Sequence, residues 1–277
     1  MGLKNRLRKI VKFFRVSEKI AVPTITDMEK LLAGKTALIT GGSSGIGLAI
    51  AEKFEAAGCQ VIIAGTKEEK LKKCCEKFES GRVKGIVLNL NEVDKFGAKL
   101  EEALSKYPDS KIDILVNCAG YHPRKAFFDI TESDYDRTMD TNVKGTFFIS
   151  QTIGMYMLKN HIKGHILNIS SSSALRPAWS PYEISKWSIR GMTKGLADTL
   201  IPFGIVVNAI APGPTATPMI GRDSKGDLDF PNNPSGRFAS PEEIANLALI
   251  LSSDMGNLVV GDTLYATGGS GVISLHR

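Results

Sequence analysis

The chain has 277 residues, of which 43% are hydrophobic and 23% charged, a composition typical of a soluble globular protein with a sizeable core. No apolar run approaches the roughly 18 residues that a membrane-spanning helix needs, so an integral membrane protein is not expected. The four cysteines and four histidines match no metal-binding spacing, so no metal site is predicted, and cysteine usage suits a reducing compartment such as the cytoplasm.

The net charge of +6 comes entirely from the N-terminus. Six of the 35 basic residues lie in the first 15 positions, and the remainder equals the 29 acidic residues, so the body of the chain is neutral and no nucleic-acid partner is expected. Apolar residues recur there at helical spacing: Leu3, Leu7, Ile10, Val11 and Phe14. Residues 3–16 are therefore predicted to touch a membrane surface peripherally, or to pack on the protein's own domain or a sister subunit.

Beyond an arm and linker at residues 1–33, short β-branched runs alternate with helical patterns. Strands are predicted at 36–40, 61–64, 83–88, 112–116, 165–169, 204–209 and 263–266. Helices are predicted at 45–57, 67–79, 93–105, 132–159, 181–200 and 241–251. This order predicts one α/β domain over 34–277, with a doubly wound parallel sheet of about seven strands and helices on both faces.

A glycine-rich turn joins the first predicted strand to the first helix. It reads Thr-Gly-Gly-Ser-Ser-Gly-Ile-Gly over residues 40–47, with the spacing G-x-x-x-G-x-G. Glycines there permit a tight turn and close backbone approach, and a helix N-terminus favours a phosphate. Taken alone, the turn is equally explained as a plain strand-to-helix connection.

Polar residues follow three later strands, at the sheet edge where ligands bind in open α/β folds. The segments are 117–120, 168–171 and 208–213. Tyr182 and Lys186 lie four positions apart on a predicted helix, so both fall on one face. A neighbouring cation favours phenolate, so Lys186 is expected to lower the pKa of Tyr182 toward a range useful for acid/base chemistry.

Together these motifs resemble the short-chain dehydrogenase/reductase family over roughly residues 34–270. The family pattern includes the glycine turn, N-x-A-G at 117–120, Asn142, a serine before Y-x-x-x-K, and P-G-x-x-x-T at 212–217. The resemblance implies a single Rossmann-type domain and an NAD(P)-dependent oxidoreductase acting on a carbonyl/alcohol pair. It is closest in kind to 3-oxoacyl-carrier-protein reductases and to sugar or polyol dehydrogenases.

The resemblance also implies residue roles. Tyr182 would be the acid/base, Lys186 would bind the nicotinamide ribose and lower the pKa of Tyr182, and Asn142 would hold a proton-relay water. Ser171, the best fit among four neighbouring serines, would bind the substrate oxygen. The cofactor would be bound by Tyr182, Lys186 and the following residues: Gly41, Ser43, Ser44, Gly45, Ile46, Gly47, Thr66, Lys67, Asn89, Leu90, Asn117, Ala119, Gly120, Pro212, Gly213, Thr215 and Thr217.

The end of the second strand favours NADP(H) over NAD(H). NAD-preferring enzymes of this kind place a carboxylate there, whereas this chain has Thr66 and Lys67, which could contact a 2′-phosphate. Against NADP(H), Ser44 stands where many NADP-preferring members carry a basic residue. NAD(H) therefore remains open.

The substrate is less defined. The long irregular segment 214–238 is predicted to be an active-site lid. Candidate pocket or rim residues are Tyr121, His122, Arg124, Arg176, Trp179 and Met219. Arg176 would recognise an anionic substrate or lie solvated at the surface.

Two other functions stay open at this stage. One is a catalytically silent nucleotide-binding scaffold or regulator. The other is a membrane-associated reductase in lipid or polysaccharide biosynthesis, delivered by the N-terminal arm. The family resemblance also implies a homo-oligomer, either a tetramer or a dimer.

Overall fold

The computed structural model describes residues 27–107, 111–223 and 226–274. Seven parallel strands form one sheet in the order β3-β2-β1-β4-β5-β6-β7. The strands are β1 (Thr36–Thr40), β2 (Gln60–Gly65), β3 (Val83–Val87), β4 (Ile114–Asn117), β5 (His165–Ile169), β6 (Val206–Pro212) and β7 (Thr263–Ala266). This confirms the predicted fold class. The central strands read as continuous apolar runs because both faces of the sheet are covered.

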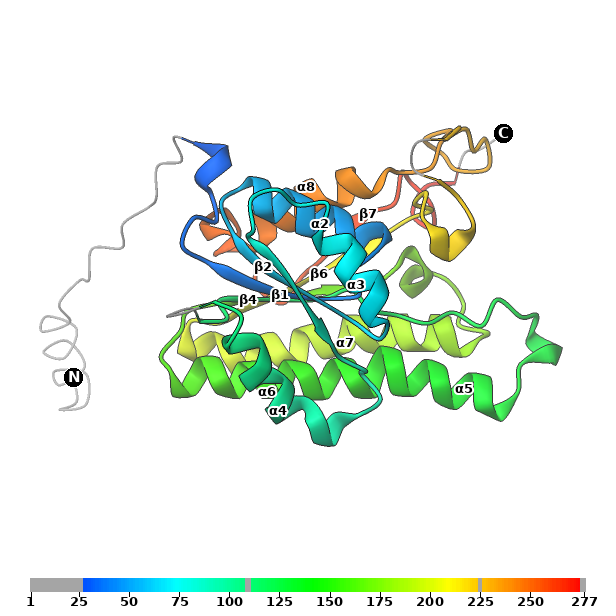
Figure 1. The fold of residues 1–277 in the computed structure, drawn as a ribbon. Coiled ribbons are helices and arrows are strands. Elements are labelled where there is room, and N and C mark those ends of the chain that lie inside the picture. Colours follow the sequence, from blue (N-terminus) through cyan, green and yellow to red (C-terminus); the bar gives the residue numbers. More distant parts are fainter. Residues whose placement is uncertain (1–26, 108–110, 224–225, 275–277) are drawn as a thin grey trace, which may run out of the picture.

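Helices cover the two faces of the sheet (Figure 1). On one face lie α2 (Gly45–Ala56), α3 (Glu68–Cys75) and α8 (Pro241–Leu251). On the other lie α4 (Phe96–Leu104), α5 (Glu132–Met139), α6 (Thr146–Lys159) and α7 (Pro181–Leu200). Two separate hydrophobic cores result, one on each side of the sheet. Burial of these apolar faces is the main stabilising contribution to such a fold.

The strand order reverses between β1 and β4. From β1 the chain adds β2 and β3 toward one edge of the sheet, and from β4 it adds β5, β6 and β7 toward the other edge. Thr40 at the end of β1 pairs with Asn117 at the end of β4. In open parallel sheets a crevice forms at such a switch point, outside the carboxyl ends of the strands. The topology therefore places the glycine turn and the segment 117–120 beside each other.

The region predicted as helical over 132–159 is helical throughout, but it is not all α-helix. A π-helical turn at Asp140–Gly145 separates α5 from α6. Two contacts occur at this turn. The Asn142 side chain hydrogen-bonds the backbone of Tyr121, and Gly145 lies so close to Leu90 that a Cβ would stand 2.5 Å from the Leu90 carbonyl oxygen. Tertiary contacts of this kind are invisible to helical periodicity, and π-turns are frequent at functional sites.

Other elements differ from prediction at their ends. The strand predicted over 204–209 runs as β6 through Pro212, because its last residues pair with β7 as far as Ala266. The strand predicted over 112–116 is displaced to Ile114–Asn117, in register with β1. The helix predicted over 67–79 ends at Cys75.

The predicted arm lies mostly in residues 1–26, outside the described part. The part of the predicted linker that is described packs on the domain: Leu32 is buried, and its N–H donates to the Ala57 carbonyl at 2.9 Å. No helix among the described residues is long and apolar enough to cross a membrane.

Candidate active site

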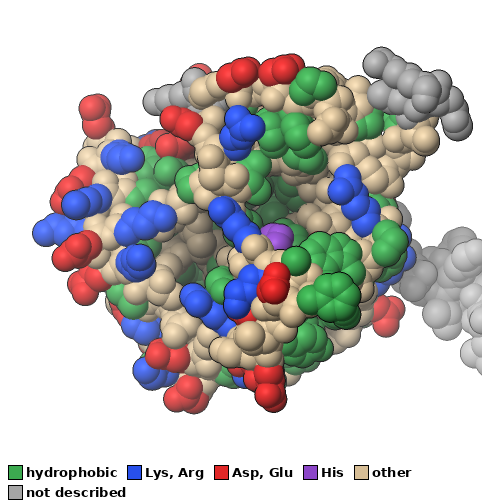
Figure 2. All heavy atoms as spheres, turned by 90° about the vertical axis from the view of Figure 1, so that its right-hand side faces the viewer, with side chains coloured by type: hydrophobic (Ala, Val, Ile, Leu, Met, Phe, Trp, Pro, Cys, Tyr) green, Lys and Arg blue, Asp and Glu red, His purple; other side chains and the backbone are tan. Residues whose placement is uncertain are grey.

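A cavity of about 490 Å³ opens at the carboxyl edge of the sheet. Figure 2 views the molecule from this side and shows it hollowed, with a histidine, hydrophobic side chains and basic side chains around the opening. Most predicted site residues line this cavity: Gly41, Ser44, Gly45, Ile46, Gly47, Ala119, Gly120, His122, Ser171, Arg176, Tyr182, Lys186, Pro212, Gly213, Thr215, Thr217 and Met219. The predicted lid contributes further lining residues, Pro214, Pro218, Ile220 and Phe238.

The glycine turn forms one wall of the cavity. Gly41 has φ +68°, and a Cβ there would stand 2.9 Å from the Ala119 nitrogen. A Cβ on Gly47 would collide with the Gly41 carbonyl oxygen. Both positions therefore require glycine for close backbone packing, as the sequence predicted.

The start of α2 is suited to an anion. The hydroxyl of its N-cap residue, Ser44, makes no capping hydrogen bond to the first turn. Free backbone N–H groups and the helix dipole at such a terminus attract phosphate. The glycine turn, Ser44 and the cavity thus fit a nucleotide pyrophosphate.

Tyr182 is placed at the cavity by the start of α7. The Ser180 hydroxyl accepts a hydrogen bond from the Tyr182 N–H at 3.2 Å, and Pro181 occupies the first helical turn, both favourable for helix initiation. The phenol hydrogen-bonds the side chain of Ser171. Ser170 instead donates to the Lys186 carbonyl at 3.0 Å. The geometry therefore supports Ser171 as the serine partner of Tyr182.

The pKa of Tyr182 corrects the sequence expectation. Burial raises the pKa of the phenol above its ordinary value, and the side-chain hydrogen bond with Ser171 opposes that rise. The expected lowering by Lys186 is not found. The Lys186 ammonium lies 5.6 Å from the centre of the Tyr182 ring and donates to the Ile169 carbonyl at 2.9 Å. Tyr182 is therefore a protonated phenol at neutral pH in this arrangement.

Lys186 is almost fully buried at the cavity wall, with 6% of its surface exposed. Burial lowers the pKa of its ammonium to about 8. Desolvation penalises the charged form, and a carbonyl is only a partial counter-charge. An amine with this pKa can gain or lose a proton near neutral pH.

Asn142 lies behind the cavity and does not line it. Its Oδ1 accepts from the Tyr121 N–H at 2.7 Å. Its Nδ2 donates to the Tyr121 carbonyl at 2.9 Å and to the Ser185 hydroxyl at 3.0 Å. Both amide hydrogens are therefore used, which leaves one lone pair of Oδ1 for a water. The side chain holds the loop after β4 against α7.

Asn117 also points away from the cavity. Its Nδ2 donates to the Ser150 hydroxyl and to Asn168 Oδ1, each at 2.8 Å, and Asn168 in turn donates to the Thr193 hydroxyl at 3.0 Å. This buried network ties β4 and β5 to α6 and α7. The amide nitrogen of Asn117 thus contacts structural partners, and its role in cofactor binding stays a prediction.

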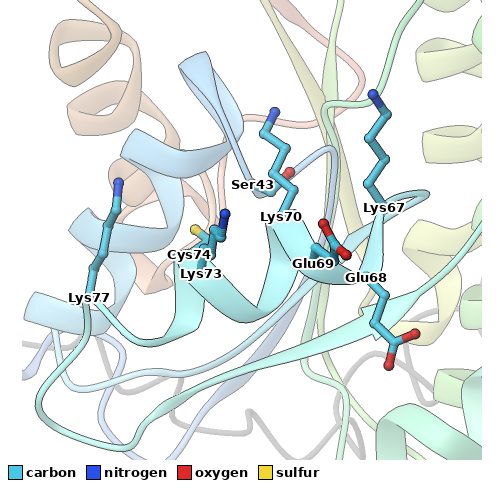
Figure 3. Close-up of a pocket in the computed structure, with 8 residues that line it drawn as sticks. All are labelled: Ser43, Lys67, Glu68, Glu69, Lys70, Lys73, Cys74 and Lys77. Atoms are coloured by element: carbon cyan, nitrogen blue, oxygen red, sulfur yellow. The ribbon is translucent and has the colours of Figure 1, made fainter.

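A second hollow of about 590 Å³ lies on the other side of the glycine turn, against α3. It is lined by Ser43, Lys67, Glu68, Glu69, Lys70, Lys73, Cys74 and Lys77. In Figure 3 the Lys67 and Lys70 side chains extend to the same side of α3 as Ser43, whereas Glu68 points the other way. Ser43 lines this groove and Ser44 lines the cavity, so the two hollows meet at the glycine turn.

Besides Asn117 and Asn142, six predicted residues line neither hollow: Thr66, Asn89, Leu90, Tyr121, Arg124 and Trp179. Of these, Arg124 reaches the lid, since its guanidinium donates to the Pro218 carbonyl at 3.2 Å. Arg176 lines the cavity, but its guanidinium hydrogen-bonds the Ser270 hydroxyl.

The sequence missed Thr40 and Cys118. The Thr40 hydroxyl accepts from the N–H groups of Cys118 (3.1 Å) and Ala119 (3.2 Å), and so fixes the end of β4 to the end of β1. The Cys118 thiol lines the cavity, and burial raises its pKa to about 12. The sequence did offer one signal for Thr40, because a polar residue stands there at the end of an otherwise apolar strand. Within the described ranges no cluster of metal-ligating side chains occurs.

Comparisons with known proteins identify the family of this fold. Residues 35–227 match the family model described as short chain dehydrogenase. The chain is 36% identical to the 3-oxoacyl-[acyl-carrier-protein] reductase of Aquifex aeolicus, covering 87% of this chain and 99% of the relative. It is 33% identical to the gluconate 5-dehydrogenase of Gluconobacter oxydans, covering 86% and 95%.

A solved actinorhodin polyketide ketoreductase with NADPH superposes with a TM-score of 0.79 at 28% identity, over 87% of this chain and 98% of that one. The fold, the cavity at the switch point and these matches lead to one conclusion. The chain belongs to the short chain dehydrogenase family and is an oxidoreductase that uses a nicotinamide cofactor.

Proposed function

We propose that the protein reduces a carbonyl compound at the 490 Å³ cavity, with Tyr182 as the proton donor. The observation that carries this proposal is the meeting of three groups at one wall: the Tyr182 phenol, the Ser171 hydroxyl bonded to it, and the buried Lys186 ammonium. The reverse oxidation uses the same groups.

When bound, the nicotinamide cofactor supplies the hydride to the carbonyl carbon. Ser171 orients the carbonyl oxygen by a hydrogen bond, which strengthens as negative charge develops there. Tyr182 transfers its phenolic proton to that oxygen, and its raised pKa keeps this proton in place beforehand. Lys186, at the same wall, would bind ribose hydroxyls of the cofactor, and Asn142 would hold a water that returns a proton from solvent.

The glycine turn and the 590 Å³ hollow beside α3 support NADP(H) as the favoured cofactor, with NAD(H) as the alternative. No carboxylate ends β2, where Gly65 is followed by Thr66 and Lys67. Lys67 and Ser43 line the same hollow, and basic residues outnumber acidic ones along it. A 2′-phosphate placed there gains charge-assisted hydrogen bonds, which exceed neutral ones in strength.

This cofactor preference is tested with Lys67→Glu and the matched control Lys77→Glu, which makes the same charge change farther along the groove. Dissociation constants for NADPH and NADH are measured by quenching of protein fluorescence. We expect Lys67→Glu to weaken NADPH binding roughly 10- to 100-fold, the value of a lost charged hydrogen bond, with NADH affected less than about 3-fold. Equal losses for both cofactors would argue against the preference.

The substrate class follows from the relatives and the cavity. The relatives' names point to 3-oxoacyl thioesters and to sugars or polyols, and both are proposed here as candidate classes. The cavity wall combines apolar lid residues (Met219, Ile220, Phe238) with the basic Arg176. A substrate with an apolar part and polar oxygens suits such a lining.

The decisive experiment is a panel of carbonyls and alcohols assayed with each of the two cofactors and followed by nicotinamide absorbance. The panel contains 3-oxoacyl thioesters, keto sugars and simple ketones. Turnover of at least one carbonyl, abolished in Tyr182→Phe, supports the proposal. Cofactor binding without turnover of any member would favour a catalytically silent nucleotide-binding scaffold.

We also propose a homo-oligomer, either a tetramer or a dimer, formed through the outer face of α6 and α7. Phe147, Met155 and Leu158 on α6 and Trp187 on α7 are exposed hydrophobic side chains. An apolar surface hollow of about 340 Å³ lies beside them, lined in part by Phe148 and Met192. Exposed apolar patches of this kind mark contact surfaces. Light scattering after gel filtration measures the oligomer, and Met155→Glu is expected to shift it toward the monomer.

For the cytoplasmic enzyme we propose, the arm at residues 3–16 would provide a peripheral membrane contact. Its six early cations and its apolar stripe carry this part of the proposal. Liposomes containing anionic lipid would co-sediment the full chain more than a Δ1–20 variant. Equal partitioning would assign the arm to protein contacts instead.

A further inference from the structure

His122 is stacked directly on the ring of Tyr182. The ring centres are 4.3 Å apart and the planes differ by only 16°. The imidazole lines the same cavity as the phenol and comes from the loop after β4 rather than from α7. Neither the glycine turn nor the Y-x-x-x-K motif involves this residue.

The orientation of the imidazole is fixed from the opposite side. Nδ1 of His122 lies 3.0 Å from the Arg124 N–H and accepts its hydrogen bond. A nitrogen that accepts is unprotonated, so the neutral ring carries its proton on Nε2. Burial and the positive charges of Arg124 and Lys186 lower the pKa of His122, while Glu183 raises it, and the net lowering keeps the ring neutral.

The loop is held in an unfavourable conformation to make this contact. Arg124 has φ +55°, a left-handed backbone that non-glycine residues rarely adopt. Its guanidinium anchors the same residue to the Pro218 carbonyl of the lid. The loop is held on the other side by the hydrogen bonds between Asn142 and the Tyr121 backbone. Strain kept by contacts on both sides is typical of functional segments.

We propose that His122 is a specificity-determining residue, which keeps Tyr182 in place by stacking and donates its Nε2–H to a second oxygen of the substrate close to the reacting carbonyl. Nε2 is on the ring edge away from Arg124, and no described residue accepts a hydrogen bond from it. The inference rests on the proposed carbonyl reduction. Both candidate substrate classes carry such an oxygen, as a hydroxyl beside the carbonyl or as a thioester carbonyl.

The test compares ketones that differ in the second oxygen. Acetoin is paired with butan-2-one, and ethyl 3-oxobutanoate with hexan-2-one, in the wild type and three variants. His122→Phe keeps a flat ring but removes both nitrogens. His122→Gln keeps a donor near the Nε2 position. Lys125→Ala is the matched control, because this exposed residue lies on the same loop, bonds Asp134 and lines neither hollow.

We expect the wild type to favour the oxygenated member of at least one pair. His122→Phe should raise KM for that member about 10-fold, with kcat changed less than about 3-fold and the plain ketone unaffected, as for loss of one hydrogen bond. His122→Gln should restore part of the difference, and Lys125→Ala should retain all of it. The pair that responds also separates the two substrate classes.

Wild-type enzyme that shows no preference within either pair would overturn the inference. So would a His122→Phe variant with equal KM changes for both members, since that indicates structural damage. Absence of turnover for every carbonyl in the wider panel would be a failure of the proposed function itself. Circular dichroism and melting temperature establish that each variant is folded.

Discussion

Two groups of polar side chains lie at the carboxyl edge of the sheet. One group faces the cavity and the other faces the protein interior. Tyr182, Ser171 and Lys186 line the cavity, and each has an atom that a ligand can reach. Asn117 and Asn142 lie behind it and donate both amide hydrogens to protein partners. All five belong to motifs of one family, yet only the first three line the cavity.

The difference teaches that a motif residue can act by holding others in place. Asn117 joins two strands to two helices, and Asn142 holds the loop that carries His122. Buried polar networks of this kind rigidify a site when every donor is satisfied. The reacting groups face the cavity because the hidden groups fix the elements that carry them.

The comparison predicts the largest effect at Tyr182. Tyr182→Phe removes the proton donor while leaving the ring for His122 to stack on. We expect turnover to fall by at least about 1,000-fold, within the range contributed by positioned acid/base groups, with melting temperature and NADPH affinity nearly unchanged. Stopped-flow turnover and fluorescence titration measure these. Turnover retained within 10-fold would place the acid elsewhere.

Lys186→Met is expected to lower turnover yet to stabilise the protein. The pKa of Lys186 falls from 10.5 to about 8 in the folded state. Burial of the charged ammonium therefore lowers the free energy of unfolding, and this penalty has its full size below pH 8. Between pH 8 and 10.5 the unfolded chain binds more protons, and wild-type stability rises with pH. Met removes this penalty but also removes the hydrogen bond to the Ile169 carbonyl. We therefore expect the free energy of unfolding at pH 7 to rise by about 1–2 kcal/mol.

Urea denaturation at pH 7 and at pH 10 measures this gain. It should shrink at the higher pH, because the wild-type penalty is then largely relieved. A gain that is the same at both pH values would show that lysine burial is not its cause.

Asn142→Ala should affect both stability and activity. It leaves the Tyr121 N–H and carbonyl and the Ser185 hydroxyl without their partner. We expect the free energy of unfolding to fall by about 3 kcal/mol and turnover to fall 10- to 100-fold through displacement of the loop. Unchanged turnover in a destabilised protein would remove Asn142 from the site.

Asn117→Ala should lower stability without changing turnover, and we expect it to have the smallest effect of the four substitutions. Asn168 Oδ1 loses its donor, at a cost of about 2 kcal/mol. Turnover per folded molecule should stay within about 3-fold of wild type at 20 °C, as measured with initial rates and a melting curve. A large loss of turnover without loss of stability would move Asn117 into the group that faces the ligand.

The sequence by itself determined the architecture and most of the cavity wall. Alternating β and α patterns were enough for a parallel sheet, because continuous apolar strands need helices on both faces. The glycine turn could be assigned from its spacing and position alone, although only the demand at Gly47 is local, since a Cβ on Gly41 would meet the distant Ala119. The Tyr182 and Lys186 pair followed from helical spacing.

Only the tertiary structure decided how those residues act. The pKa of Tyr182 depends on burial and on Ser171, and the pKa of Lys186 depends on desolvation, so spacing alone gave the wrong direction for the phenol. The π-turn at Asn142, the inward direction of Asn117 and the His122 stack arise from contacts between segments distant in sequence. Local patterns specify which side chains are available, whereas burial and partner geometry set their protonation and direction.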